Sequence, residues 1–206
     1  MPRNVLTAQD LESVASGGEL AIAADTLITP LAREEAERRN ITLRAVEPKQ
    51  GSAGRVVAIG ADHGGYPLKE ELKAYLRTWG YVVLDQGTDS ADAVDYPDFA
   101  EAVANAVVRG DAWRGVIIDS AGIGSAIAAN KVPGARAALC YDRPSARNSR
   151  EHNDANVLSL GAKMISSDAA REIVALWLET PFAGGRHQRR IDKIRAIEAR
   201  HNKSSS

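Results

Sequence analysis

The 206-residue chain has little of the chemistry that supports disulfides, metal centres or membrane insertion. Cys140 is its single cysteine, which excludes an intrachain disulfide and fits a reducing compartment. The four histidines are scattered without HExxH or Cys/His spacing, so we expect neither a metal site nor a cofactor. Apolar runs are too short to cross a bilayer, and the first residues contain no apolar signal segment. With a net charge of -1, we expect a cytoplasmic protein without nucleic-acid or membrane partners.

Composition divides the chain into a small and a large part. Residues 47–54 are polar and rich in Gly, Pro and Ser, and we interpret them as a linker. Residues 1–46 before it form an N-terminal extension with too few apolar groups to hold a large core. Residues 55–201 form the main domain, and residues 202–206 a flexible tail.

The extension itself is predicted to be of the α+β class. Residues 19–23 and 41–46 have the composition of strands. Thr7 is expected to cap a short helix over residues 8–15, and Thr29-Pro30 opens a second, charged helix. Such a unit is expected to dock on another surface.

Strand and helix patterns alternate along the whole main domain. Alternation of this kind predicts a Rossmann-like three-layer α/β fold, with a parallel sheet between two layers of helices. Ligands bind beyond the C-terminal ends of the strands in such sheets. The five strands are expected at residues 55–61, 81–84, 116–118, 135–141 and 157–160.

Two polar pairs follow predicted strands, each beside a glycine-containing turn. Asp62-His63 follows the first strand, and Asp119-Ser120 follows the third. The glycine turn and helix start after Asp119 direct backbone N–H groups into one space that suits a phosphate or an oxyanion. The alternative is that Asp62 and Asp119 only cap the helices that follow them.

Two further features suit anion chemistry without requiring it. Arg186 and Arg190 are four residues apart, which places both guanidinium groups on one face of a predicted helix, suited to a phosphate. The same spacing is also typical of a solvated basic face. His152 lies in REHNDAN, where Asn or Asp could fix its tautomer, although a surface histidine would fit there too.

Long segments of the main domain resemble a known family. The matching segments are IGADHGGYPLKEEL, DQGTDS, VDYPDFA, GIGSAIAANKVPGARAAL, REHNDANVLSLGAK and GGRHQRRIDKI. They resemble the type B ribose-5-phosphate isomerases and their galactose-6-phosphate isomerase relatives. The resemblance implies a fold with five parallel strands, a homodimer or dimer of dimers with sites shared between subunits, and metal-free interconversion of aldose and ketose phosphates.

The resemblance also implies roles for individual residues. His152 would open the sugar ring from the partner subunit, and Gly122, Ile123, Gly124 and Ser125 would supply backbone donors to the enediolate. Asp62 and Tyr96 would bind sugar hydroxyls or assist ring opening. The remaining substrate contacts would come from His63, Ser120, Asn153, Lys163, Arg186 and Arg190, with His63 and the two arginines on the phosphate.

The loop after the third strand departs from the family pattern. Asp119 takes the position of a cysteine base, and Ala121 that of a threonine. Another branch uses a glutamate at the position of Ser125, which cannot act as a base unaided. Three hypotheses follow: Asp119 is the base for ribose 5-phosphate, the changed loop marks another C4–C6 sugar phosphate, or catalysis is lost and the protein only binds a sugar phosphate.

A short segment of the extension has its own resemblance. LITPLAREEAERRNITL is similar to an element found in several enzymes associated with bacterial microcompartments. This implies a piece that docks on shell or cargo proteins of a microcompartment. The alternative is an extension that packs against its own dimer.

Overall fold

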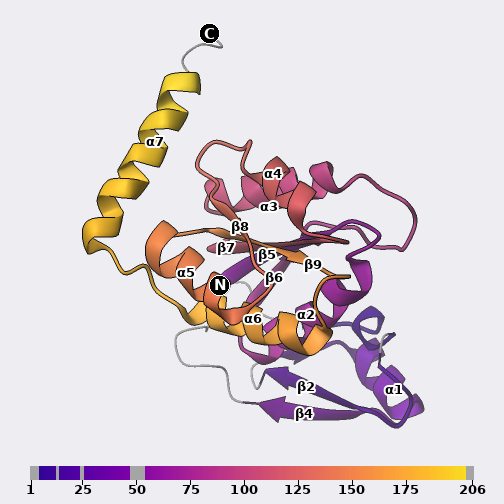
Figure 1. Ribbon diagram of the computed structural model, residues 1–206. Coiled ribbons are helices and arrows are strands. Elements are labelled where there is room, and N and C mark those ends of the chain that lie inside the picture. Colours follow the sequence, from indigo (N-terminus) through magenta and orange to yellow (C-terminus); the bar gives the residue numbers. More distant parts are fainter. Residues whose placement is uncertain (1–4, 13, 24–25, 47–53, 203–206) are drawn as a thin grey trace.

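The main domain is a parallel sheet between two layers of helices (Figure 1). The structure is a computed structural model that describes residues 5–12, 14–23, 26–46 and 54–202. All neighbouring strands of the five-stranded sheet run parallel. The predicted fold class is therefore confirmed. In spatial order the strands are β6 (Val82–Asp85), β5 (Val56–Ala61), β7 (Arg114–Asp119), β9 (Val157–Gly161) and β8 (Ala137–Leu139).

Alternate residues of the buried strands face two separate cores. Val57 and Ile59 of β5 pack with one core, and Ala58 between them packs with the other. Trp177 is the largest fully buried side chain of the first core. Helices α2 (Tyr66–Thr78), α5 (Arg143–Asn153) and α6 (Ser167–Glu179) cover the first face, and α3 (Tyr96–Val108) and α4 (Ile123–Ala129) the second (Figure 1).

Prolines set the starts of three helices of the main domain. Pro67, Pro97 and Pro144 lie in the first turns of α2, α3 and α5. Their fixed φ suits this position, and their missing N–H would have no partner there in any case. The sequence pattern predicts helix starts near residues 68, 99 and 145, two or three residues later than in the structure, because it does not take the prolines into account.

The N-terminal extension forms a small lobe with its own core. Strand β2 (Glu19–Ala23) pairs in parallel with β4 (Thr42–Val46), and β1 (Val5–Leu6) with β3 (Leu27–Ile28). Helix α1 (Pro30–Arg38) covers them, and its cap is Thr29, whose hydroxyl accepts from the Ala32 N–H at 3.2 Å. The two predicted strands and the helix after Thr29 are confirmed. Six buried side chains form the core: Leu6, Leu11, Ile22, Ala32, Ala36 and Ile41.

The helix predicted over residues 8–15 is wrong. Only a 3-10 turn forms there, at Gln9–Leu11. The Thr7 hydroxyl donates to the Asp10 carboxylate at 2.8 Å instead of capping a backbone N–H group. Most of the predicted linker, residues 47–53, and the tail residues 203–206 lie outside the described residues.

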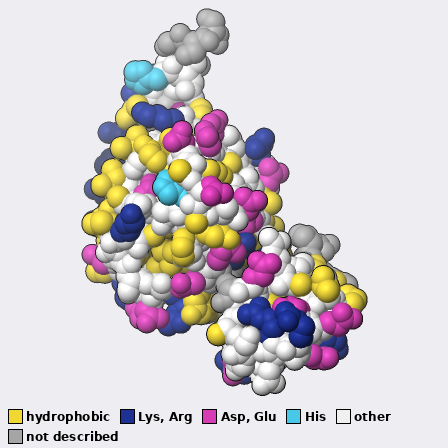
Figure 2. Space-filling model, turned by 90° about the vertical axis from the view of Figure 1, so that its right-hand side faces the viewer, with side chains coloured by type: hydrophobic (Ala, Val, Ile, Leu, Met, Phe, Trp, Pro, Cys, Tyr) yellow, Lys and Arg dark blue, Asp and Glu magenta, His cyan; other side chains and the backbone are white. Residues whose placement is uncertain are grey.

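The lobe docks on the side of the main domain formed by α2. Figure 2 shows it as a separate bulge below the main body. Asp10 of the lobe forms an ion pair with Arg77 of α2. Burial alone would raise the pKa of Asp10, but Arg77 and the hydrogen bonds from Thr7 outweigh it and hold that pKa below its ordinary value of 3.8.

Docking of the lobe is expected to weaken in acid. A carboxyl whose pKa is lowered by docking stabilises the docked state above its ordinary pKa, and this contribution is lost as pH falls through the lowered value. The protection factors for hydrogen exchange of the β2 and β4 amides should therefore fall below about pH 4. Asp10→Asn should lower the free energy of the opening that allows these amides to exchange at neutral pH, by on the order of 1 kcal/mol. Glu12→Gln, which changes an exposed neighbouring carboxylate, is the control. Equal exchange in the two variants would show that the Asp10–Arg77 ion pair does not contribute to docking.

Within the described ranges, no helix combines the length and apolar character that crossing a membrane requires.

Candidate active site

The loops that follow β5 and β7 meet at one edge of the sheet. Strands β6 and β7 lie on opposite sides of β5, so the crevice where ligands bind in such folds opens between these two loops. The Asp62 N–H donates to the Ile118 carbonyl at 3.2 Å. Gly64 lies so close to the Ser120 hydroxyl that a Cβ at this position would collide with it. The structure therefore brings together the two polar pairs that the sequence singled out.

Residues around these loops share the same edge. The buried Asp62 carboxylate accepts from the Gly65 N–H at 2.9 Å and so shapes the turn before α2. His63 is exposed, with its Nδ1 3.2 Å from the Val94 carbonyl. The Lys163 N–H donates to the Ser120 carbonyl at 3.0 Å, which places exposed Lys163 beside the β7 loop.

Asp119 is enclosed by the loop that it begins. Its Oδ1 accepts from the N–H groups of Ala121, at 2.7 Å, and Gly122, and its Oδ2 accepts from the Ser125 N–H at 3.0 Å. Gly122 has a φ of +80°, and a Cβ there would collide with Leu139. The carboxylate is 5% exposed. The loop thus holds the Asp119 side chain in a single orientation.

These hydrogen bonds divide the donors of the loop into two kinds. The N–H groups of Gly122 and Ser125 are already engaged by Asp119. The N–H groups of Ile123 and Gly124, at the start of α4, donate to no group within the described residues. A carboxylate has about four acceptor positions, so three bonds leave one on Oδ2. The Ser125 hydroxyl is fully buried and has no partner among the described residues.

Tyr96 covers the free donors. It is the first residue of α3, and its ring lies against Gly124 so closely that a Cβ on this glycine would collide with it. Tyr96 remains 39% exposed, so the ring also faces solvent. We call Asp62, His63, Tyr96, Ser120, the 119–125 loop and Lys163 the loop cluster.

A second cluster surrounds His152. The His152 ring stacks on that of His187, with centroids 4.1 Å apart and an interplanar angle of 7°. The His152 Nδ1 lies 2.8 Å from the Asn148 amide nitrogen, and the His187 Nε2 lies 3.5 Å from the Arg186 Nε. Arg190 is close enough to His187 to lower its pKa. We call His152, His187, Arg186 and Arg190 the histidine cluster. Asn153, next to His152 at the end of α5, is exposed.

The expectation that Arg186 and Arg190 share one helical face is wrong. Arg186 lies in the 3-10 turn Gly185–His187, and Arg190 lies in α7 (Gln188–Asn202). Two glycines at positive φ, Gly184 and Gly185, precede Arg186, and the chain passes through a 3-10 turn before α7 begins at Gln188.

The two clusters lie at opposite ends of the strands: the loop cluster lies beyond their C-terminal ends, and the histidine cluster lies near their N-terminal ends. Helix α5 begins beyond the C-terminal end of β8 and returns to the start of β9. Its 11 residues, from Arg143 to Asn153, span about 16 Å at 1.5 Å per residue. Among the described residues, none of the hydrogen bonds, ion pairs or ring contacts joins the histidine cluster to the loop cluster.

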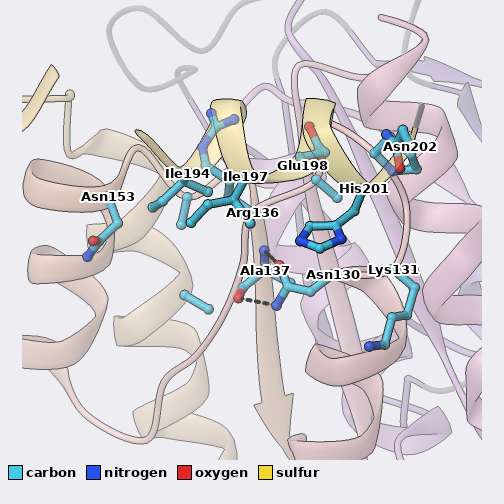
Figure 3. Close-up of a pocket in the computed structure, with 14 residues that line it drawn as sticks. Asn130, Lys131, Arg136, Ala137, Asn153, Ile194, Ile197, Glu198, His201 and Asn202 are labelled. Atoms are coloured by element: carbon cyan, nitrogen blue, oxygen red, sulfur yellow. Dashed lines mark hydrogen bonds between the residues drawn. The ribbon is translucent and has the colours of Figure 1, made fainter. Parts of the chain in front are cut away.

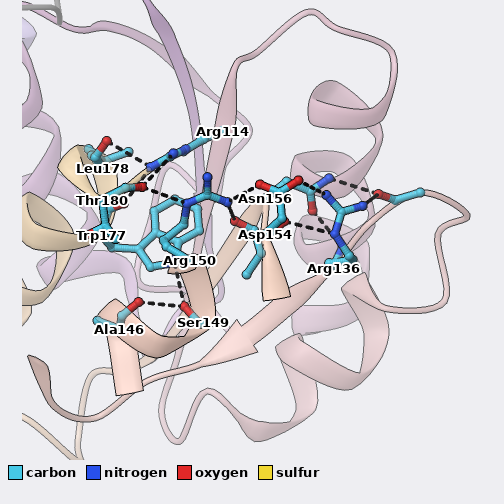
Figure 4. A network of polar contacts seen from close by, with 12 residues as sticks. Arg114, Arg136, Ala146, Ser149, Arg150, Asp154, Asn156, Trp177, Leu178 and Thr180 are labelled. Carbon is cyan, nitrogen blue, oxygen red and sulfur yellow. Dashed lines mark hydrogen bonds and ion pairs between the residues drawn. The ribbon is translucent and has the colours of Figure 1, made fainter. Parts of the chain in front are cut away.

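Buried arginines fix the segment that carries the histidine cluster (Figure 4). Arg114 donates to the carbonyls of Trp177, at 2.6 Å, and Thr180, at 3.1 Å, at the end of α6. Arg150 donates to the same Thr180 carbonyl at 3.3 Å and to the Asp154 carboxylate at 2.9 Å. Burial and the charge of Arg150 lower the pKa of Arg114 to about 9. The ends of α5 and α6 are thereby tied together just before Arg186.

Sequence reasoning missed two residues of the site. His187 lies within the segment GGRHQRRIDKI, where neither its spacing nor its neighbours distinguish it from a surface histidine. Tyr141 donates from its hydroxyl to the Ala121 carbonyl at 2.6 Å and so braces the β7 loop from the end of β8. No sequence pattern marks this contact.

Cys140 takes no part in either cluster. It is 1% exposed within the first core, and burial raises the pKa of its thiol. In the described part of the chain, no three His, Cys, Asp or Glu side chains gather as metal ligands would.

A groove separates α7 from the β8 edge of the sheet (Figure 3). Its volume is about 620 Å³. Ile194, Ile197 and His201 of α7 face Asn130 and Arg136 across it. Ile191 of the same helix is buried, whereas Ile194 and Ile197 are 45% and 50% exposed. The loop cluster contributes no residue to this groove.

Comparison with known proteins assigns the main domain. Residues 57–194 match the family model of the Ribose/Galactose Isomerase family. The chain belongs to the ribose/galactose isomerase family. This membership makes it an aldose–ketose isomerase of sugar phosphates. Residues before 57, including the whole N-terminal lobe, lie outside the match.

Individual members of the ribose/galactose isomerase family agree closely with this chain. It is 45% identical to ribose-5-phosphate isomerase B of Escherichia coli (strain K12) over 146 residues, which cover 71% of this chain and 98% of the relative. It is 40% identical to the D-erythrulose-4-phosphate isomerase of Pectobacterium atrosepticum over 139 residues, covering 67% and 91%. The structure of Clostridium thermocellum ribose-5-phosphate isomerase B is similar, with a TM-score of 0.70 and 51% identity, covering 71% and 99%.

Proposed function

We propose that the chain interconverts D-ribose 5-phosphate and D-ribulose 5-phosphate through ring opening and an enediolate. One observation carries the proposal. A carboxylate, Asp119, is held at the ligand-binding edge of the sheet beside two backbone donors, those of Ile123 and Gly124, that have no other partner among the described residues. A base next to unoccupied oxyanion donors is the arrangement that enolisation requires.

Proton transfer is assigned to Asp119. Its Oδ2 takes the proton from C2 of the open-chain aldose, the C–H electrons form the C1–C2 double bond, and negative charge moves to the C1 oxygen. The Ile123 and Gly124 N–H groups hold that oxygen. The O2 proton then moves to O1, which places the negative charge on O2. The charge on O2 forms the C2 carbonyl as the C1–C2 double bond takes the proton back from Asp119 at C1, which leaves the ketone at C2. Asp62 and Tyr96 bind sugar hydroxyls beside the loop.

A second copy of the chain completes the site. The role assigned to His152, ring opening, requires contact with the sugar, but His152 lies at the far end of α5, a helix about 16 Å long that runs away from the C-terminal ends of the strands. A homodimer that places one copy's loop cluster against the other's histidine cluster removes this separation. Helix α7 projects from the body with half-exposed isoleucines, as an element covered by a partner would (Figure 1).

The phosphate is held where the two copies meet. His63 and Lys163 contribute from the loop cluster, and Arg186 and Arg190 from the histidine cluster. Arginine forks suit phosphate oxygens, whereas Lys163 adds a single-point charge. Ser120 and Asn153 contact sugar oxygens.

A tetrose phosphate is the second candidate substrate. The similarity to a D-erythrulose-4-phosphate isomerase favours it, as does the Asp119 loop that departs from the cysteine pattern. Turnover measured over a panel of C4 to C6 sugar phosphates tests both candidates. The highest kcat/KM should fall on ribose 5-phosphate. A maximum on a tetrose phosphate would make that sugar the substrate in place of ribose 5-phosphate. Binding without turnover of any sugar phosphate would show that the protein only binds its ligand.

The N-terminal lobe is proposed as a docking piece for a microcompartment, which places the enzyme in the cytoplasm inside such a shell. Its position outside the family match and its exposed Leu27 and Leu31, at 49% and 64%, support this role. Co-expression with microcompartment shell proteins should give co-purification of the full chain but not of a chain lacking residues 1–50. Equal recovery of the two chains would contradict this role and favour the alternative, in which the lobe packs against its own dimer.

A further inference from the structure

His187 is the most enclosed ionisable group of the histidine cluster that the proposed chemistry does not use. It is 6% exposed, and its Nδ1 is buried without a partner among the described residues. Buried polar atoms are almost always satisfied, and exceptions gather at functional positions. Its ring lies flat on the ring of His152. The stack therefore leaves the His187 Nδ1 without a hydrogen bond, at a cost in free energy that packing alone does not explain.

Hydrogen bonds around the stack fix the proton of His152. The Asn148 amide nitrogen only donates, so the His152 Nδ1 that lies 2.8 Å from it is an acceptor. A neutral His152 ring consequently carries its proton on Nε2. With Asn148 at one edge and His187 on one face, the direction of that Nε2–H is set by the cluster.

The surroundings of His187 favour the neutral form of its ring. Burial lowers its pKa, and so do the neighbouring His152, Arg186 and Arg190, while Glu151 acts in the opposite direction. A neutral imidazole can stay stacked when His152 takes up a proton, whereas two imidazolium rings at this separation would repel each other.

Arg186 connects the stack to the phosphate site. Its Nε lies 3.5 Å from the His187 Nε2, and the two residues are adjacent in the same turn. An anion that orders Arg186 therefore also orders the ring beneath His152.

We propose that His187 is a positioning residue for ring opening: it holds the His152 imidazole flat, with Nε2 directed at the sugar, and links that orientation to phosphate bound at Arg186. The inference rests on the proposed function, because it presumes that His152 opens the ring of a cyclic sugar phosphate. It assigns to His187 no contact with the reacting carbons.

Two reactions of one enzyme separate ring opening from proton transfer. Conversion of ribose 5-phosphate requires ring opening. Ribulose 5-phosphate carries its phosphate on the oxygen that would close a furanose ring, so it is acyclic. Deuterium uptake at its C1 in D₂O requires only removal and return of the C1 proton through the enediolate.

His187→Leu removes the flat ring, and His187→Phe restores one without ionisable nitrogens. The leucine variant should convert ribose 5-phosphate about 10²-fold more slowly. Its deuterium uptake into ribulose 5-phosphate should stay within about twofold of the parent's, because that reaction needs no general acid for ring opening. The phenylalanine variant should regain most of the lost conversion. The melting temperatures of both variants report on folding.

Each outcome separates this inference from the function on which it rests. If the parent shows neither reaction, the proposed function fails. If the parent shows both and His187→Leu slows both equally, His187 supports the site in general and the inference is overturned. Unchanged conversion in the leucine variant also overturns it, and so does a phenylalanine variant no better than leucine.

Discussion

Asp119→Asn is expected to lower the turnover of ribose 5-phosphate about 10³-fold while the fold is retained. An amide cannot take the C2 proton, so the enediolate no longer forms. The asparagine oxygen can still accept from Ala121 and Gly122, but its amide group faces the Ser125 N–H and loses that hydrogen bond. The expected loss of stability is about 1 kcal/mol. Steady-state turnover and thermal unfolding measure the two effects.

A matched control separates loss of the base from loss of a carboxylate–amide contact. Asp142 accepts from the Ser145 N–H at 2.7 Å at the start of α5, away from the loop cluster. Asp142→Asn should cost similar stability and leave turnover close to the parent's. If Asp119→Asn turns over as fast as the parent, the base lies elsewhere. Isothermal titration with inorganic phosphate should show that the variant still binds an anion.

Mixing two inactive variants is expected to restore activity. If one copy supplies the loop cluster and the other the histidine cluster, a heterodimer of Asp119→Asn and His152→Gln contains one intact site and one doubly damaged site. Random exchange of subunits makes half of the dimers heterodimers, so about a quarter of the parent activity should return. Co-expression with two different affinity tags allows the heterodimer to be isolated and assayed alone.

A second pair of variants is the control for recovery of activity that does not depend on shared sites. Asp119→Asn and Tyr96→Phe both lie in the loop cluster of one chain, so their heterodimer has no intact site and should regain nothing. If recovery is absent in both mixtures although subunits exchange, one chain must build the site alone. Recovery in both would indicate that the variants damage assembly and not chemistry.

Sequence was a good guide to the fold because local patterns and long segments pointed the same way. Short apolar runs marked the five strands, and the polar pairs at Asp62 and Asp119 meet as the strand order requires. Helix starts were less accurate, since proline rather than apolar periodicity sets them in α2, α3 and α5. The failed helix at residues 8–15 shows that a hydroxyl can bond a nearby carboxylate as readily as a backbone N–H.

The sequence names candidate residues for the site but does not predict their arrangement. Residue types and the family resemblance name Asp119, His152 and Arg186. They do not show that Asp119 uses two of the donors expected for the enediolate, because that depends on loop dihedrals such as the positive φ of Gly122. Nor does linear spacing show that Arg186 lies in a 3-10 turn and that α7 begins only at Gln188. The stack of His152 on His187 joins α5 to the turn before α7, which only tertiary packing decides.

Burial of Cys140 has a consequence for the conditions under which this enzyme can work. The loop after β7 carries the carboxylate of Asp119 at the position where the family resemblance implies a cysteine, and Cys140, the single cysteine of the chain, is 1% exposed with a raised pKa. Alkylating reagents and peroxide attack the accessible thiolate. With Asp119 as the proposed base, these reagents have no accessible thiol to modify, and the activity of the isomerase should not change on treatment with peroxide or thiol-alkylating reagents.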